Sequence, residues 1–256
     1  MPGLIESLEK AIAKLYRKRV SRRLYEQSSK AVEHGPFAGM KLIAFSHISS
    51  APLALKLFGL YEREVVDFLV SQKGMDTLIN LGAGDGYFSV GLLRSGTVDR
   101  ALSFEIDRKG REAIAQNAEQ NGVSDKVRIF GAADGNLLQT LQAEGVVPAS
   151  TLFLCDIEGA EFAVVDDALA EFLADATFVI EIHDFLFADG AARLEALKTR
   201  LGRHHDVEMV KAGPADWRGI AQLEALHDNA RALVTSDGRK KLGLWLFALP
   251  KGQPSR

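Results

Sequence analysis

Short apolar runs alternate with helix-like segments through the middle of this 256-residue chain, and no other feature constrains its fold as strongly. Such alternation predicts strand–helix–strand units and a mostly parallel sheet with helices on both faces. Right-handed crossovers then give a doubly wound, Rossmann-like α/β fold. The predicted strands are residues 78–81, 101–105, 127–130, 151–155 and 177–182, and the predicted helices are residues 87–94, 109–121, 161–173 and 190–201.

The two ends of the chain depart from this alternation. Apolar runs at residues 206–210 and 242–249 flank a polar stretch, and we expect them to pair antiparallel at one edge of the sheet. Residues 7–27 have apolar positions at helical spacing and many Lys and Arg, which is typical of a basic amphipathic helix. Residues 53–72 predict a second helical segment. We therefore expect an N-terminal helical extension or lid over residues 1–65 and a ligand-binding domain over residues 66–256.

Composition limits the classes of partner and compartment. The formal net charge is −3 and the isoelectric point is near 6.1, so we expect no general binding to nucleic acid. The single cysteine, Cys155, cannot form an intramolecular disulfide and suits a reducing compartment. No apolar run is long enough for a membrane span, and charges interrupt the N-terminus where a signal peptide would be apolar. These features predict a soluble, cytoplasmic protein.

A glycine occupies every second position where the first predicted strand passes into its helix. Gly82, Gly84 and Gly86 lie in the stretch INLGAGDGYFS, at the carboxyl edge of the sheet where ligands bind in doubly wound folds. Backbone amides of such a loop suit an anionic group. Glu105 ends the next strand, where a carboxylate can accept hydrogen bonds from both hydroxyls of a ribose. Together the two features predict an adenosine-containing ligand.

The residue after the third glycine separates two kinds of adenosine ligand. A dinucleotide-binding fingerprint has glycine at this position, where the helix packs closely on the strand, but this chain has Tyr87. A nicotinamide-dependent oxidoreductase is therefore the less favoured alternative. The G-x-G-x-G spacing preceded by Asn80 instead resembles the first motif of class I S-adenosylmethionine (AdoMet) methyltransferases.

Five segments in order resemble the FkbM-type methyltransferase family. They are GLYEREVVDFL, INLGAGDGYFS, FEIDRKGREAIAQNAEQNG, LCDIEGAEF and VIEIH, and they lie within residues 55–185. The family has D-x-E-G-x-E at the end of the fourth strand and E-x-H at the end of the fifth. The resemblance implies a class I methyltransferase fold and S-adenosyl-L-methionine as cofactor. Asn80 is a departure, because many such enzymes have an acidic residue there and an amide offers no Coulomb attraction to the ammonium group of the cofactor.

The family pattern carries over to this chain residue by residue. It implies that the glycine loop surrounds the methionine part of the cofactor, that Glu105 binds the ribose and that Asp134 lies near the adenine amino group. A turn before Gly135 is the alternative role for Asp134. The expected cofactor-binding residues are Asn80, Gly82, Ala83, Gly84, Gly86, Tyr87, Phe88, Glu105, Ile106, Asp134 and Asp156.

Four polar groups at the ends of the fourth and fifth predicted strands are the candidate catalytic residues. Alternation along a strand places Glu181 and His183 on one side, and likewise Asp156 and Glu158 if the extended geometry continues. Methyl transfer to an alcohol requires removal of its proton, and His183 is the expected base because imidazole titrates near neutral pH. The same groups suit a divalent ion, but the histidine offers proton removal without one. We therefore predict that the site binds no metal.

The acceptor and the role of the basic N-terminal helix stay open at this level. We expect O-methylation of a small-molecule, sugar or lipid-linked acceptor, with an AdoMet-binding protein that has lost catalysis as the alternative. The basic helix is either a solvated lid or a contact surface for an anionic substrate or a membrane. Neither the acceptor atom nor the oligomeric state follows from the sequence.

Overall fold

The computed structural model describes residues 2–43, 53–236 and 243–252, and it divides into two compact units. The first unit contains Met1–Asp67 and Gly213–Lys241, and the second contains Phe68–Ala212 and Leu242–Arg256. The expected boundary between residues 65 and 66 lies beside the point where the chain first passes between the units. Residues 213–241, however, group with the N-terminal segment, whereas the sequence assigned them to the ligand-binding domain.

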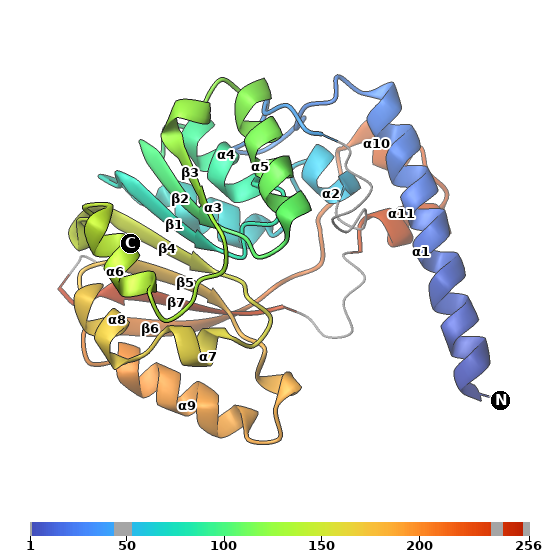
Figure 1. Cartoon of the computed structure of the whole chain (residues 1–256). Coiled ribbons are helices and arrows are strands. Elements are labelled where there is room, and N and C mark those ends of the chain that lie inside the picture. The colour runs from blue at the N-terminus through green and yellow to red at the C-terminus, as the bar shows by residue number, and fades with distance from the viewer. Residues whose placement is uncertain (1, 44–52, 237–242, 253–256) are drawn as a thin grey trace. The chain divides into compact units, whose positions relative to one another are not determined.

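The second unit is built on a seven-stranded sheet in the order β3-β2-β1-β4-β5-β7-β6 (Figure 1). The pairs among β1 to β5 are parallel, and β7 pairs antiparallel with both β5 and β6. The predicted doubly wound sheet with an antiparallel edge is therefore confirmed. The strands are β1 (Thr77–Leu81), β2 (Arg100–Phe104), β3 (Val127–Phe130), β4 (Thr151–Cys155), β5 (Thr177–Glu181), β6 (His205–Lys211) and β7 (Leu244–Pro250).

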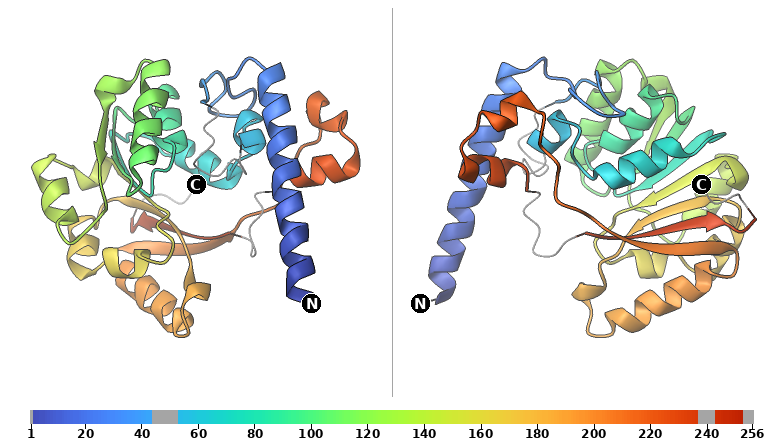
Figure 2. Two further views of the ribbon diagram at one scale, coloured as in Figure 1. Left: turned by 45° about the vertical axis from the view of Figure 1, so that its right-hand side comes forward. Right: turned by 180° about the vertical axis from the view of Figure 1, so that it is seen from behind.

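Helices cover both faces of this sheet, so β1, β4 and β5 are buried along their whole length (Figures 1 and 2). On one face Ile79, Phe153 and Phe178 pack with apolar side chains of α6, α8 and α9. On the other face Asn80 contacts Ser89 of α4. The helices of this unit are α4 (Tyr87–Arg94), α5 (Arg108–Gln120), α6 (Leu137–Ala143), α7 (Glu161–Val164), α8 (Asp167–Phe172) and α9 (Gly190–Leu201), with 3₁₀ turns at Ser124–Lys126, Pro148–Ser150 and Asp184–Leu186.

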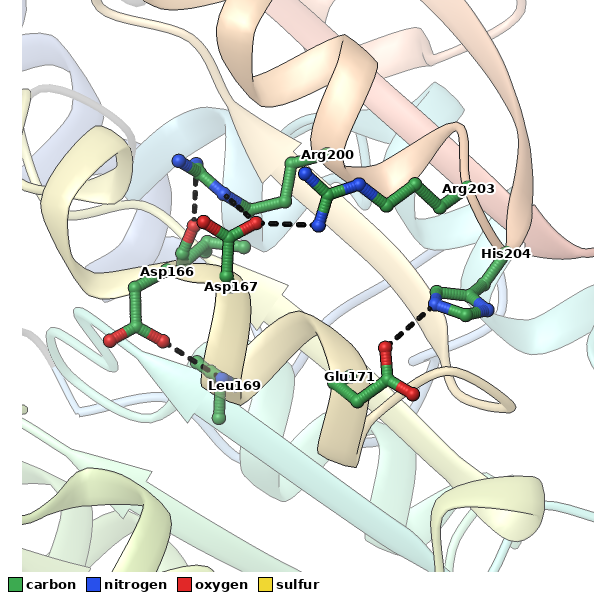
Figure 3. A network of polar contacts seen from close by, with 8 residues as sticks. Asp166, Asp167, Leu169, Glu171, Arg200, Arg203 and His204 are labelled. Atoms are coloured by element: carbon green, nitrogen blue, oxygen red, sulfur yellow. Dashed lines mark hydrogen bonds and ion pairs between the residues drawn. The ribbon is translucent and has the colours of Figure 1, made fainter.

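The prediction of one continuous helix over residues 161–173 is wrong, because the chain forms two short helices there. Asp166 is extended between α7 and α8, and its carboxylate accepts a hydrogen bond of 2.8 Å from the Leu169 amide as an N-cap. The carbonyl of Val165, freed by the break, accepts 2.9 Å from the Arg200 guanidinium of α9 (Figure 3). The apolar periodicity continues across the break, which is why the sequence did not reveal it.

The first unit contains the long helix α1 (Pro2–Gln27), α2 (Leu53–Leu57), α10 (Ala221–Glu224), α11 (Asp228–Val234) and the start of α3 (Arg63–Ser71). The predicted helical segment 53–72 is thus two helices, with Gly59 between them at φ +66° and against the His34 carbonyl. Helix α1 runs beside α11 (Figures 1 and 2), and Tyr16 Oη lies 3.3 Å from His227 Nε2.

Within the described residues, no helix is both long enough and apolar enough to cross a membrane.

Candidate functional site

The loop between β1 and α4 needs its glycines for three different reasons. Gly82 has φ +79°, and a Cβ there would lie 1.8 Å from the Asp156 carbonyl oxygen, so only glycine lets the two loops touch. Gly86 has φ +84° and packs against Ile114 of α5. Gly84 has φ +57°, but none of the described atoms lies within 4 Å of the place where its Cβ would be. Space beside Gly84 therefore suits a ligand, whereas Gly82 and Gly86 serve packing.

The Glu105 carboxylate is held against this loop by two backbone amides. Its Oε2 accepts 2.8 Å from the Gly84 amide and its Oε1 accepts 2.8 Å from the Asp107 amide. Gly110 of α5 makes this possible, because a Cβ at that position would lie 2.5 Å from Glu105 Cγ. Sequence reasoning missed Gly110, although a glycine inside a predicted helix was the available signal. Each carboxylate oxygen retains a further acceptor position for a ligand hydroxyl.

Two other predicted cofactor residues lie at the solvent-exposed rim after β2 and β3. The Ile106 side chain is 78% exposed, which is unusual for a large apolar residue beside a polar loop. Asp134 is exposed, and its Oδ1 accepts 2.9 Å from the Asn136 amide, which is the turn role that we set beside adenine recognition. The structure therefore places both residues where a ligand could reach them.

The remaining loop residues lie in the core. Asn80 is buried and donates 3.0 Å to Ser89 Oγ, which lies 2.8 Å from Ser103 Oγ. Ala83 and Tyr87 are also buried, whereas Phe88 is half-buried. The Asn80 amide is thus part of a buried polar chain beneath α4. Its expected contact with the cofactor stays a prediction that this geometry does not favour, since the donor end of the amide already has a partner.

The four candidate catalytic groups converge around His183, as the sequence predicted. His183 Nε2 lies 3.7 Å from Asp156 Oδ1, 3.7 Å from Glu158 Oε2 and 3.9 Å from Glu181 Oε2. The extended geometry assumed after β4 ends at Glu158, whose φ is +52°. This turn nevertheless keeps the carboxylate facing the imidazole. The four side chains come from the ends of β4 and β5, which are paired neighbours in the sheet.

The carboxylates set the electrostatics of this cluster. Burial by itself lowers the pKa of His183, but the contact with Glu161 and the negative charges of Glu161, Asp156 and Glu158 outweigh it, so the pKa is raised from 6.5. Burial, with the charges of Glu161 and Asp156, raises the pKa of the Cys155 thiol well above its ordinary value. Cys155 is therefore a buried apolar side chain in β4 and not a nucleophile.

Glu161 is a buried carboxylate of the candidate site that the sequence analysis did not single out. Its side chain is completely buried, and it accepts hydrogen bonds from the backbone amides of Gly159 and His183. The available signal was the last glutamate of the D-x-E-G-x-E motif, which a helical pattern over residues 161–173 made look like an ordinary helix residue. Burial separates it from the exposed Glu158.

Three of the converging groups have the arrangement of a possible cation site. One ligand atom each from Asp156, Glu158 and His183 lies within 4.8 Å of the other two, the one such group found among the described residues. Hard divalent ions accept carboxylate oxygens and the occasional imidazole, so this donor set does not exclude them. The predicted independence from metal stays a prediction that needs its own experiment.

No protein-family model matches the chain. Among curated proteins, the ribosomal protein L11 methyltransferases of Actinobacillus pleuropneumoniae and Yersinia pseudotuberculosis are similar to short stretches of it. The first is 38% identical over 71 residues and the second 36% over 58 residues, which are 28% and 23% of this chain. The matched stretches span 23% and 20% of the length of these relatives.

Two solved structures are similar over most of the chain. The O-methyltransferase TomG from Streptomyces achromogenes, in complex with SAM, has a TM-score of 0.53 at 15% identity and covers 82% of this chain and 92% of its own. Cofactor-bound Rv0187 from MTB has a TM-score of 0.50 at 15% identity, over 75% and 80%. At this level of identity the likeness establishes the Rossmann-like fold that this chain shares with a methyltransferase.

The raised pKa of His183 gives a first prediction. In an NMR titration of the ring nitrogens, His183 should titrate above 6.5 and His205, whose pKa burial lowers, below 6.5. Glu158→Gln removes one negative charge facing the imidazole, so it should lower the pKa of His183 and leave His205 unchanged. A His183 that titrates at or below 6.5 in the wild type would contradict this electrostatic description.

Proposed function

We propose that this protein is an AdoMet-dependent methyltransferase that methylates an oxygen atom of a small-molecule, sugar or lipid-linked acceptor. One observation carries the proposal: the Gly82 backbone lies against the Asp156 carbonyl. The glycine loop therefore contacts the acid–histidine cluster, which is Asp156, Glu158, Glu181 and His183. A ligand beside Gly84 is thereby adjacent to groups that can remove a proton. The shared fold with TomG, the short similarities to methyltransferases and the FkbM-type motifs support the same proposal.

The residues present suit this cofactor. Gly84 has open space on the side where a side chain would project, and Glu105 has a carboxylate fixed at the end of β2. Glu105 would bind the ribose hydroxyls, and the exposed Ile106 would lie against the adenine ring, losing apolar surface to it. Asp134 would accept from the adenine amino group. When bound, AdoMet supplies an electrophilic methyl group.

The remaining catalytic work is done by the chain itself. His183 would accept the proton of the acceptor hydroxyl, so that the oxygen can attack with its lone pair. Asp156 follows β4, next to the glycine loop, and would position the acceptor near the transferring group. Glu158 and Glu181 face the imidazole and would stabilise the imidazolium that forms. Holding the acceptor oxygen next to the methyl group of the bound cofactor, with water excluded, would provide the rest of the rate enhancement.

Two alternatives make different demands on the same residues. A nicotinamide-dependent oxidoreductase would not require the cluster after β4 and β5, and Tyr87 is buried where that class has glycine. An AdoMet-binding protein without catalysis would keep Gly84 and Glu105 but not a histidine among four carboxylates. We place the protein with the FkbM-type family and in the cytoplasm, for which the motifs and the lone buried cysteine are the support.

Cofactor binding provides the direct test. Gly84→Val should place a branched side chain in the proposed ligand space, and this steric overlap should weaken AdoMet binding, measured by calorimetry, by more than about 10-fold. Gly96→Val is the matched control, since Gly96 also has positive φ and open space but lies at the end of α4. Equal AdoMet affinity in both folded variants would refute this placement, and tight binding of NAD instead would favour the oxidoreductase.

Turnover provides the mechanistic test. Incubation with methyl-labelled AdoMet and an extract of the source cells should label an acceptor, and His183→Ala should slow labelling by about two to four orders of magnitude. AdoMet affinity should be nearly unchanged, because the proposed role of His183 is to accept the proton of the acceptor and not to bind the cofactor. Labelling should also survive EDTA. If EDTA abolishes labelling and Mg²⁺ or Mn²⁺ restores it, the acid–histidine cluster holds a metal.

We further propose that helix α1 contacts an anionic lipid surface. Leu8, Ile12 and Leu15 are 61%, 59% and 69% exposed, and their spacing places them on one face of the helix. Residues 7–27 contain seven Lys and Arg against two Glu. Exposed apolar side chains combined with basic charge are two features of peripheral membrane helices, and they are what supports this proposal.

Vesicle co-sedimentation tests this contact. The wild type should bind phosphatidylglycerol-containing vesicles at low salt, and substitution of Lys14, Arg19 and Arg23 by Gln should weaken binding by about 100-fold, at about 1 kcal/mol per charge. Substitution of the exposed Lys73, Lys126 and Lys211 by Gln removes equal charge from elsewhere and should have little effect. Equal binding by both variants, or self-association through α1 without vesicle binding, would end the membrane proposal.

A further inference from the structure

Glu161 is a completely buried carboxylate that joins the two strand ends of the candidate site. It is the first residue of α7. Oε2 accepts 2.7 Å from the Gly159 amide and Oε1 accepts 2.8 Å from the His183 amide. Both oxygens act as acceptors, as in an ionised carboxylate, and a buried charge is tolerated only with such partners. The side chain therefore connects the loop after β4 to the end of β5.

The same carboxylate faces one nitrogen of the His183 ring. Nδ1 lies 3.4 Å from Glu161 Oε1, whereas Nε2 lies 3.7 Å from both Asp156 Oδ1 and Glu158 Oε2. The Nδ1 contact is longer than an ordinary N–H···O bond, and within the described part of the chain Nδ1 has no bond of ordinary geometry. The two ring nitrogens thus have different surroundings: Nδ1 faces the buried Glu161 carboxylate, and Nε2 faces the carboxylates of Asp156 and Glu158.

We propose that Glu161 is a positioning residue that keeps the proton of neutral His183 on Nδ1 and leaves Nε2 as the proton acceptor. The inference rests on the proposed function and deepens it. A neutral imidazole has one donor and one acceptor nitrogen, and the group beside one nitrogen decides the role of the other. With Nδ1–H directed at Glu161, the Nε2 lone pair points at the cluster formed by Asp156, Glu158 and Glu181.

The proton balance of the step follows from this assignment. The hydroxyl proton of the acceptor passes to Nε2, so the O–H bond breaks, an N–H bond forms and the ring becomes a cation. Glu161 then faces a positive charge through Nδ1–H, which shortens and strengthens their contact. The buried carboxylate has no side-chain exposure, whereas that of Glu158 is 83% exposed. Among these carboxylates, Glu161 contributes most to raising the pKa of His183, ahead of Asp156 and Glu158.

The chain offers a matched control for this pair. His204 Nε2 lies 3.0 Å from Glu171 Oε2 on the exposed surface formed by α8 and the start of β6 (Figure 3). Glu171→Gln therefore breaks a histidine–carboxylate pair of the same chemistry. Neither residue is among the groups that face His183. An effect of Glu161→Gln that Glu171→Gln does not share belongs to the site.

Nitrogen-15 NMR of the histidine rings in the full chain tests the assignment. Neutral His183 should be the Nδ1–H tautomer in the wild type. Glu161→Gln should introduce the Nε2–H tautomer and lower the pKa of His183, because a charge beside the imidazolium is lost; Glu171→Gln should do neither. In the labelling assay, Glu161→Gln should reduce the maximal rate about 10- to 100-fold with AdoMet affinity unchanged. The acidic limb of the pH–rate profile should move to lower pH, because the pKa of His183 is lower in this variant.

Several outcomes would overturn the proposal. A wild-type His183 with its proton on Nε2 does so without any variant, which keeps the test decisive if Glu161→Gln fails to fold. A Glu161→Gln protein that melts at lower temperature but retains the tautomer and pKa of His183 would show a structural role only. Failure of the proposed function is recognised separately, since a wild type that transfers no methyl group still reports the tautomer.

Discussion

The contact between the Gly82 backbone and the Asp156 carbonyl is the constraint on which the candidate site depends. Because Gly82 has no side chain, the loop after β1 approaches the loop after β4, and the Asp156 amide bonds the Leu81 carbonyl at 2.9 Å. Any larger residue would separate the loops. The open space beside Gly84 and the polar groups after β4 would then lie further apart at this edge of the sheet.

The sheet determines where polar chemistry can occur. Helices cover both faces, so β1, β4 and β5 are buried, and within these strands the one charged side chain is Glu181 at the end of β5. Charged groups are consequently confined to the strand ends, where Asp156, Glu181 and His183 collect. Glu181 and His183 are buried there, and Glu161 of α7 is the most deeply buried of the carboxylates that face His183. Its two backbone hydrogen bonds offset the desolvation and make it a rigid support for the ring that it faces.

The electrostatic design concentrates negative charge around one imidazole. Burial alone would favour neutral His183, but the surrounding carboxylates favour the cation more strongly. A base in such surroundings accepts a proton readily, and the resulting cation is stabilised where it forms. Glu105 is different, because its carboxylate is directed by backbone amides and by the absence of a side chain at Gly110. Under the proposed function, one glutamate would bind the cofactor and the others would assist proton transfer.

Much of the order of strands and helices could be predicted from the sequence, since periodicity and glycine spacing are local properties. Helix 87–94 and strands 127–130 and 151–155 were predicted with the bounds that the structure has. The convergence of Asp156, Glu158, Glu181 and His183 also followed, because neighbouring parallel strands end at the same edge.

Burial and the contacts between individual atoms became clear from the three-dimensional structure. At the break before α8 the Val165 carbonyl accepts from Arg200, residues 213–241 group with the first unit, and the Asn80 amide donates to Ser89. The role of Gly110 depends on its close approach to Glu105, and that of Glu161 on its contact with His183, 22 residues further along the chain. Long-range contacts decide desolvation and hydrogen-bond partners, and these leave no periodic trace in a single sequence.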